Sequence, residues 1–501
     1  PVTPQQRTLD PLVVSMYTTS GATPPPVAGA SLTAIGDKLW VFGGRLVSNR
    51  LMTNELYSLD LETFVWRRHA DLPGDPPPEP RYFHSADQSG PDRLVIFGGM
   101  GQRSQGSGGS SHDASTVLSD VTVLDVSDPQ RPRWRRPRVS GPTPRARYAH
   151  LTAVNGRQLV VIGGQDLQNT YVEDVHTLDL DTFTWTKASP FPKHCGVYRS
   201  ISLCYAGSTY VYSNYNFTDV RRELQVLGPD LHLTDRSRGM TGENLPPGLR
   251  FPTGHLIGNH LVVSGTYLTN TSQTFATWLL DMRRLVWARL ECSRPLHNGS
   301  WNRAVLDARR NRHLILGHRD RTLLADYEHR RVNFDHVAAV CLESYGVYDM
   351  PRQRVSVLGQ ELGCMLLDRP QFSDFEIRAA VEERTIYVNT RLLRERWPYF
   401  DRLIRANAQE HHRRYLRLPE PYPVVYHMLR YLYSGALDPS SSVDILGELM
   451  VLGDVYNLTD LAAHAADVLH GRLTLDTTPH IFRYATMARR NGLRVRALRI
   501  M

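Results

Sequence analysis

The side chains that could bind metal ions or carry out redox chemistry show no spacing typical of a metal site. The five cysteines are an odd number, are widely scattered, and form no Cys-x-x-Cys pair and no closely spaced Cys and His motif. A structural zinc site needs closely spaced thiolate and imidazole ligands, and a disulfide scaffold needs a dense, even set of cysteines. The sequence therefore argues against both, and we expect no metal ion or other cofactor.

The high arginine content is the second feature of the sequence with consequences for binding. The chain has 58 Lys and Arg residues and a formal net charge of +8, yet lysine occurs only as Lys38, Lys187 and Lys193. Guanidinium groups pair bidentately with carboxylates and phosphates. The densest run, RPRWRRPR at 131–138, interleaves Trp134 with arginines as nucleic-acid patches do. Because Trp134 also has a place in a repeat, we interpret the run as a solvated loop and expect no nucleic-acid partner.

Much of the chain that carries these arginines is an internal repeat. Three apolar segments end in paired glycines, LWVFGG (39–44), LVIFGG (94–99) and LVVIGG (159–164), and each is followed by a second strand and a tryptophan. The glycines are Gly43, Gly44, Gly98, Gly99, Gly163 and Gly164, and the tryptophans are Trp66, Trp134 and Trp185. Glycine allows the backbone to turn with positive φ or to approach a neighbour closely. We expect each tryptophan to fill the wedge between adjacent sheets.

The repeat predicts a β-propeller, because four short strands at a period of about 50 residues are typical of one blade. The paired glycines and the spaced tryptophan resemble kelch repeats. Later copies at 209–214, 261–265 and 313–318 are degraded. We expect six blades over residues 10–350, with seven as the alternative. The segment 13–21 resembles the last strand of a blade and is expected to close the ring against the final unit.

Beyond about residue 370 the hydrophobic period changes from two toward 3.6, which indicates helices after a strand pair. Helices are expected over 422–435, 443–458 and 460–469, the last with Thr459 as N-cap. The order of motifs resembles the BTB (POZ) domain. The residues that carry this resemblance are Ser373, Asp374, Leu392, Leu393, Tyr399, Phe400, Tyr433, Ser434, Gly435, Tyr456 and Leu458. Asn389 departs from the family, which usually has His there.

The predicted fold is therefore multidomain, with an all-β kelch-type propeller followed by an α/β BTB/POZ domain. We place the propeller at 1–350, the BTB domain at 371–475 and the start of a truncated helical extension at 476–501. Residues 351–370 are either a linker or the first BTB helix. Leu358, Leu362 and Met365 lie there at helical spacing. In the helical interpretation they form the dimer interface, and in the alternative they belong to a last propeller strand or a packed linker.

The order of propeller and BTB domain resembles leucine-zipper-like regulators and the fungal kelch proteins of Ras and cell-polarity signalling. The resemblance implies a non-enzymatic adaptor whose propeller binds a client protein. Its BTB domain would form a homodimer and recruit a cullin ubiquitin-ligase scaffold; the alternative is a signalling scaffold without ligase activity. A kelch-fold copper oxidase is a remote alternative, since the sequence offers no recognisable set of copper ligands.

Client binding is expected on the loops that follow the glycine pairs, because a rigid ring can present variable loops. Arg45, Arg50 and Arg103 are the candidate contacts, since arginine is enriched at binding hot spots; solvated loop charges are the alternative. An arginine-rich face suits an acidic client, such as a small GTPase or a polarity factor.

Cullin recruitment by BTB domains commonly uses a bulky apolar residue followed two positions later by Glu. Here the motif reads Ala408-Gln409-Glu410, and the small alanine would lose about 1–2 kcal/mol of buried contact. Phe400 and Tyr422 are expected to supply apolar area to the same interface. No apolar run approaches the roughly 18 residues that cross a bilayer, so we expect a cytoplasmic protein, or one at the cell cortex.

Overall fold

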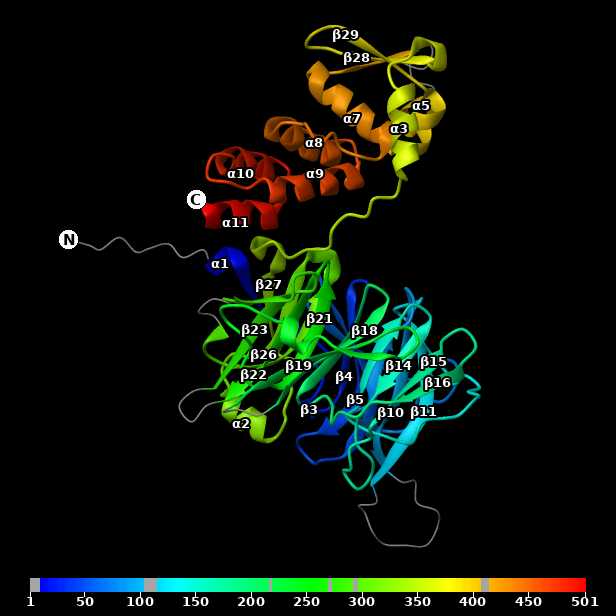
Figure 1. Ribbon diagram of the computed structural model, residues 1–501, viewed down its shortest axis with the longest axis vertical. Coiled ribbons are helices and arrows are strands. Elements are labelled where there is room, and N and C mark those ends of the chain that lie inside the picture. Colours follow the sequence, from blue (N-terminus) through cyan, green and yellow to red (C-terminus); the bar gives the residue numbers. More distant parts are fainter. Residues whose placement is uncertain (1–9, 103–114, 216–218, 269–272, 292–295, 407–413) are drawn as a thin grey trace, which may run out of the picture. The chain divides into compact units, whose positions relative to one another are not determined.

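The computed structural model describes residues 10–102, 115–215, 219–268, 273–291, 296–406 and 414–501. The described chain forms two compact units, residues 10–341 and residues 342–501. The first consists almost entirely of strands and the second mainly of helices (Figure 1). The expected end of the propeller at residue 350 lies inside the second unit. There Tyr348 donates a hydrogen bond from its hydroxyl to Asp467, at 2.8 Å.

Six sheets make up the first unit, so the expected six blades are confirmed. Blades 1 to 3 are built from β2 (Ser20–Gly21), β3 (Val27–Ala28), β4 (Ser31–Ile35), β5 (Lys38–Leu46), β6 (Met52–Asp60), β7 (Val65–His69), β8 (Arg81–Tyr82), β9 (Ser85–Gln88), β10 (Arg93–Gln102), β11 (Ser115–Asp125), β12 (Arg133–Arg135), β13 (Leu151–Asn155), β14 (Gln158–Ile162), β15 (Asp174–Asp179) and β16 (Thr184–Pro190). Neighbouring strands within each blade pair antiparallel, apart from the short parallel pair of β2 with β7.

Blades 4 to 6 repeat this arrangement without complete glycine pairs. Their strands are β17 (Ser200–Tyr205), β18 (Ser208–Tyr215), β19 (Arg221–Leu227), β20 (Leu233–Asp235), β21 (Arg250–Ile257), β22 (His260–Leu268), β23 (Gln273–Asp281), β24 (Val286–Leu290), β25 (Ser300–Asp307), β26 (Arg312–His318) and β27 (His336–Cys341). A short helix, α2 (Leu323–Glu328), is inserted between β26 and β27 of the last blade.

The ring is closed by a strand from the beginning of the described chain. After the short helix α1 (Asp10–Val13), strand β1 (Val14–Thr18) pairs antiparallel with β27, with Val14 opposite Val340. This confirms the expected closure, which gives β27 a second partner and so covers an edge that would otherwise be unpaired.

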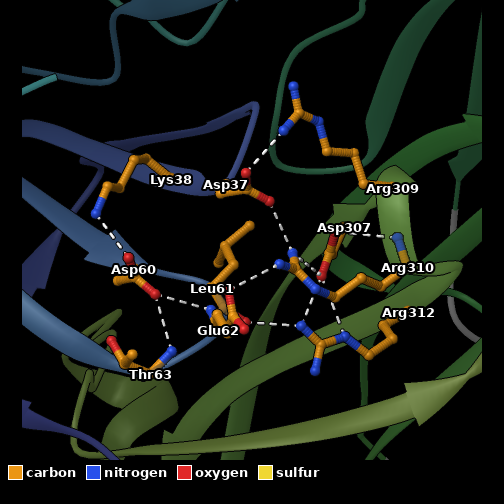
Figure 2. Close-up of polar contacts among 10 residues, drawn as sticks. All are labelled: Asp37, Lys38, Asp60, Leu61, Glu62, Thr63, Asp307, Arg309, Arg310 and Arg312. Carbon is orange, nitrogen blue, oxygen red and sulfur yellow. Dashed lines mark hydrogen bonds and ion pairs between the residues drawn. The ribbon is translucent and has the colours of Figure 1, made fainter. Parts of the chain in front are cut away.

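An ionic cluster supports the same junction between blade 6 and blade 1 (Figure 2). Asp37, in the turn between β4 and β5, pairs with Arg310 of blade 6 at 3.0 Å. The fully buried Asp307 pairs with Arg312 at 2.7 Å, and Arg312 donates to the carbonyl oxygen of Leu61 in blade 1, also at 2.7 Å. Charged side chains of blade 6 therefore bond to a side chain and to the backbone of blade 1.

Tryptophans pack blades 1, 2 and 3 each against the blade before it. Trp66 contacts Phe334 of blade 6, Trp134 lies 5.0 Å from the ring of Phe42 in blade 1, and Trp185 lies 5.5 Å from Phe97 in blade 2. All three tryptophans are buried. Large aromatic rings thus fill the space that opens between twisted neighbouring sheets.

The second unit has a small mixed sheet surrounded by helices. Strand β28 (Phe375–Ala379) pairs antiparallel with β29 (Arg384–Val388) and parallel with β30 (Tyr415–Leu418). The helices are α3 (Val357–Leu366), α4 (Thr390–Arg396), α5 (Pro398–Arg405), α7 (Tyr422–Ser434), α8 (Val443–Val455), α9 (Thr459–Gly471), α10 (Thr478–Met487) and α11 (Asn491–Ile500). One continuous apolar core joins the sheet to all of these helices except α3.

The ends of these helices have identifiable causes. Asn389 is the N-cap of α4 and accepts a hydrogen bond from the Leu392 amide at 3.1 Å, so the residue that departs from the family performs a capping role. Gly435 ends α7 with a φ of 71°. The expectation for Thr459 was wrong: it is the first residue of α9, and no side-chain hydrogen bond caps that helix.

Residues 357–366 form a helix, which excludes the alternative of a last propeller strand. Ser356 caps α3 by accepting the amide of Gly359, at 3.2 Å. Gly363 lies directly against the backbone of Tyr433 in α7, where a Cβ atom would come within 2.2 Å of the carbonyl oxygen. The missing side chain therefore allows α3 to pack closely on the BTB core.

Candidate protein-binding sites

The paired glycines shape the loops at one end of the propeller. All six have positive φ: Gly43, Gly44, Gly98, Gly99, Gly163 and Gly164. The first glycine of a pair lies against the following blade; a Cβ atom on Gly98 would be 2.8 Å from the carbonyl oxygen of Arg147. The second lies against its own blade, and a Cβ atom on Gly99 would be 2.8 Å from that of His84. Each loop therefore begins where the glycine backbone packs closely against neighbouring residues, with no room for a side chain.

Two buried arginines, which the repeat pattern alone did not single out, hold these glycine positions. Arg81 donates to the carbonyl oxygen of Gly98 at 3.0 Å and makes two hydrogen bonds to Asp120, each of 2.8 Å. Arg147 likewise donates to the carbonyl oxygen of Gly163, at 3.1 Å, and makes one hydrogen bond to Asp174, at 2.6 Å. The shared sequence Arg-Tyr-x-His at 81–84 and 147–150 could have identified them as part of the repeat.

The three arginines predicted as client contacts have different surroundings. Arg45, at the end of β5, stacks on the ring of Tyr82 with its guanidinium carbon 5.0 Å from the ring centre. Arg50 is exposed in the turn between β5 and β6, where its φ is 62°. Arg103 lies outside the described residues. The structure therefore brings Arg45 to an aromatic cluster and leaves Arg50 open to solvent.

That aromatic cluster surrounds a cavity at the centre of the ring. The cavity has a volume of about 80 Å³, and its lining includes Phe83 of blade 2, Phe251 of blade 5 and Arg303 of blade 6. Tyr82, Tyr148 and Tyr198 extend the aromatic surface around Phe83. These residues come from separate blades, and neither their sequence spacing nor the repeat pattern indicates that they meet.

The insertion after β26 places another arginine in this cluster. The guanidinium carbon of Arg330 lies 5.8 Å from the ring centre of Phe83, 5.3 Å from that of Tyr198 and 5.7 Å from that of Phe251. Burial raises the pKa of Tyr198, which keeps its hydroxyl protonated. Helix α2, just before Arg330, lies at the same end of the propeller as β3 (Figure 1). The cavity is lined by residues of α2 and by Ala30, and Ala30 also packs against Gly44 at the start of the first glycine loop.

An apolar stripe on α3 is the main candidate interface of the second unit. The exposed fractions are 65% for Leu358, 51% for Leu362 and 67% for Met365, although all three are large apolar side chains. Val357, at 71%, continues the stripe. Adjacent exposed apolar side chains of this size are typical of protein interaction sites.

The residues expected to face a cullin do not all lie at the surface. Phe400 is fully buried between Phe375 and Trp397, so the expectation for it was wrong: it belongs to the core. Tyr422 is partly exposed, and the guanidinium of Arg384 lies 3.5 Å from its ring centre. Ala408 and Glu410 lie outside the described residues.

Within the described ranges, no three His, Cys, Asp or Glu side chains are grouped so that they could hold a metal ion. None of the helices described is both long and apolar enough to span a bilayer.

Known proteins resemble this chain in both units. A profile of the KLHDC2/KLHL20/DRC7 Kelch-repeats domain matches residues 8–213 and 106–318, and a BTB/POZ domain profile matches residues 365–473. Protein ral2 of Schizosaccharomyces pombe is 29% identical over 96% of this chain and 92% of its own length. Acyl-CoA-binding domain-containing protein 4 of Arabidopsis thaliana is 33% identical over 43% of this chain, and human Kelch domain-containing protein 1 is 34% identical over 36% of it. The chain therefore belongs to the kelch-repeat family and carries a BTB/POZ domain after its propeller.

Proposed function

We propose that this protein is a non-enzymatic adaptor that binds a client through its propeller and forms a homodimer through its BTB domain. The observation that carries the proposal is the likeness to protein ral2, which extends over 96% of this chain and 92% of the relative. The likeness thus includes the order of the two domains as well as each domain separately. A function that needs both domains is therefore the natural one to propose.

The client is proposed to belong to Ras or cell-polarity signalling, such as a small GTPase or a polarity factor. The basis is the resemblance of the domain order to fungal kelch proteins of those pathways. Arg45 and Arg50 follow the first glycine pair along the sequence, and Arg103 follows the second. Arginines that protrude from a rigid scaffold suit an acidic partner surface.

Dimerisation is proposed through α3. Leu358, Leu362 and Met365 would lose their solvent-exposed area against a second copy, at about 25 cal/mol for each Å² of apolar surface buried. A twofold axis makes the same stripe meet itself, so a single apolar face suffices for both subunits. A dimer would present two client-binding propellers together.

A cullin ligase adaptor is the second candidate. The observation in its favour is Glu410, which stands where BTB domains carry the glutamate of their cullin-binding motif. Ala408 in place of a bulky residue weakens this case, and so does the burial of Phe400. The signalling scaffold and the ligase adaptor share the same propeller site and differ only in what the BTB domain recruits.

Affinity purification of the complete protein followed by mass spectrometry separates the two candidates. Recovery of a cullin with the client supports the ligase adaptor, and recovery of Ras-pathway or polarity proteins without a cullin supports the scaffold. A matched purification of a variant lacking the propeller identifies which partners depend on that domain. If no protein is enriched over a tag-only control, the adaptor function is wrong.

A further inference from the structure

The pair of helices α10 and α11 carries a concentration of positive charge. Residues 477–501 contain six arginines and no Asp or Glu, although the whole chain has 50 acidic residues against 58 Lys and Arg. Both helices bury an apolar face, which includes Ile481 and Tyr484 of α10 and Leu493 and Val495 of α11. Helix α10 packs against both α8 and α11 (Figure 1). The arginines therefore belong to packed helices of the second unit.

Two of the six arginines interact with other groups of the same unit. Arg496 donates a hydrogen bond to Nδ1 of His470, at 2.9 Å. The guanidinium carbon of Arg499 lies 4.0 Å from the ring centre of Tyr345. These two side chains therefore contribute to packing within the unit.

Two more arginines lie beside carboxylates of α8. Arg483 is 3.6 Å from Asp444, and Arg490 is 3.0 Å from Asp454. Asp444 is also 3.1 Å from Nδ1 of His480. The side chains in both arginine pairs are at least 32% exposed, so water and salt screen the attraction and leave the surface accessible to a stronger anion.

The remaining two arginines are in or next to the turn between α10 and α11. Arg489 is exposed and Arg494 is partly exposed, and neither forms an ion pair with a residue that the structure describes in this unit. The Arg494 amide donates to the carbonyl oxygen of Arg490 at 3.0 Å, which places these two side chains one helical turn apart. Arg489, Arg490 and Arg494 together are called the basic turn below.

Exposed apolar side chains lie next to the basic turn. Met487, the last residue of α10, is 56% exposed, and Val455, the last residue of α8, is 64% exposed. The ion pair between Arg490 and Asp454 brings the end of α8 to the turn. A surface that combines guanidinium groups with protruding apolar side chains suits the interface of an anionic bilayer. A nucleic acid would satisfy the charges but would leave Met487 and Val455 in water.

We infer that the basic turn is a docking site for the surface of an anionic membrane. The inference goes beyond the proposed adaptor function, because it concerns where the protein is held and not what its propeller binds. The three guanidinium groups would form charge-assisted hydrogen bonds with the phosphates and carboxylates of lipid headgroups. Met487 and Val455 would enter the headgroup layer beside them.

Co-sedimentation of the purified full chain with lipid vesicles tests this inference. Vesicles of phosphatidylcholine and phosphatidylserine in equal parts should bind the protein, and vesicles of phosphatidylcholine alone should not. The double variant Arg489→Gln with Arg494→Gln should bind the anionic vesicles about tenfold more weakly. The matched control is Arg157→Gln with Arg319→Gln, because these propeller side chains are 76% and 62% exposed. It removes the same net charge and should change the binding by less than about twofold. Equal losses in the two double variants would overturn the inference.

Arg489→Gly tests whether the side chain of Arg489 instead supports the fold. Arg489 has a φ of 51°, which glycine adopts readily, and the Arg490 amide fixes the turn by donating to the carbonyl oxygen of Ala485 at 2.8 Å. The glycine variant should therefore melt at the wild-type temperature or above it, and should still bind anionic vesicles more weakly. A clear fall in Tm would show that Arg489 has a structural role and would overturn the inference.

Two further measurements separate a membrane from other anionic partners. Met487→Ser should weaken vesicle binding at unchanged net charge, and unchanged binding would contradict insertion into the headgroup layer. Fluorescein-labelled polyuridylate is the nucleic-acid probe. If the wild type binds it and the Arg489→Gln, Arg494→Gln variant loses that binding while keeping its binding to vesicles, the surface binds nucleic acid and the inference is wrong. Failure of the wild type to sediment with the anionic vesicles would also refute it, and would leave the adaptor function intact.

Discussion

The indole nitrogen of Trp66 donates a hydrogen bond to the carbonyl oxygen of Phe334 at 3.1 Å, and the two rings meet edge to face with centres 5.5 Å apart. These residues are separated by most of the propeller sequence, yet they join blade 1 to blade 6. The contact shows that the junction that closes the ring has the same aromatic packing as the junctions between blades 1 and 2 and between blades 2 and 3. The ionic cluster around Asp307 adds to it (Figure 2).

Asp307→Asn should weaken this junction. The buried carboxylate pairs with Arg312 at 2.7 Å, and its replacement by a neutral amide leaves Arg312 without its counter-charge. We expect a loss of about 3–5 kcal/mol of stability, measured by chemical denaturation. Asp181→Asn, which breaks the exposed ion pair with Arg157, is the control and should cost less than about 1 kcal/mol. Equal effects would show that the cluster does not stabilise ring closure.

Gly99→Val should destabilise the propeller strongly. Gly99 has a φ of 101°, and a Cβ atom there would lie 2.8 Å from that of His84. We expect backbone strain and overpacking together to cost about 3 kcal/mol or more, and Gly164→Val to behave alike.

Gly156→Val isolates the strain, because Gly156 also has positive φ but faces open space. Its cost should be about 1–2 kcal/mol in the same unfolding experiment. Thermal melts left unchanged by Gly99→Val and Gly164→Val would contradict the close packing described for these loops.

Leu362→Asp should convert the proposed homodimer into a monomer. A charged side chain in the centre of the α3 stripe would have to be buried against its own copy in the partner. Light scattering at micromolar concentration is the measurement, and an unchanged propeller melt shows that the fold is kept. Leu475→Asp is the control, because Leu475 is also exposed, at 76%, but is not on α3. A wild type that is already monomeric would refute the dimer.

Ala408→Met should strengthen cullin binding if the ligase-adaptor candidate is correct. The longer side chain would restore about 1–2 kcal/mol of apolar contact, which corresponds to roughly a tenfold gain in affinity. Glu410→Ala should weaken the same binding through loss of a hydrogen-bond acceptor. Co-purification of a cullin with each variant measures both effects. The gain is the sharper result, because general damage to the domain cannot produce it.

Asp87→Asn should stabilise the protein near neutral pH. Burial raises the pKa of Asp87 to about 6, although the Thr152 hydroxyl donates to its carboxylate at 2.5 Å. Because the folded pKa exceeds the unfolded value of about 3.9, the folded state favours the protonated form. That contribution is complete below about pH 4 and is lost as the pH rises through about 6. The variant should gain on the order of 1 kcal/mol at pH 7 and show less change in Tm between pH 4 and 7.

Much of the fold was predictable because its determinants are local or repeat along the chain. The glycine pairs, the spaced tryptophans and the change of hydrophobic period near residue 370 predicted the propeller, its six blades, its closing strand and the BTB domain. Errors arose where the outcome depended on packing. Residues 342–350 join the second unit because Tyr348 and Glu343 find partners in α9 at Asp467 and His470. Phe400 is buried because the rings of Phe375 and Trp397 enclose it.

By itself, the sequence determined the repeat, the domain order and an arginine-rich character, since each follows from residue types at fixed spacing. Only the tertiary structure decided which arginines share a site. Arg303 and Arg330 come from a degraded blade and an insertion, and the rings that contact Arg330, those of Phe83, Tyr198 and Phe251, belong to other parts of the ring. The physical reason is that a closed ring brings the inner ends of all its blades to one centre. Residues far apart in the chain then become neighbours with no signal in their spacing.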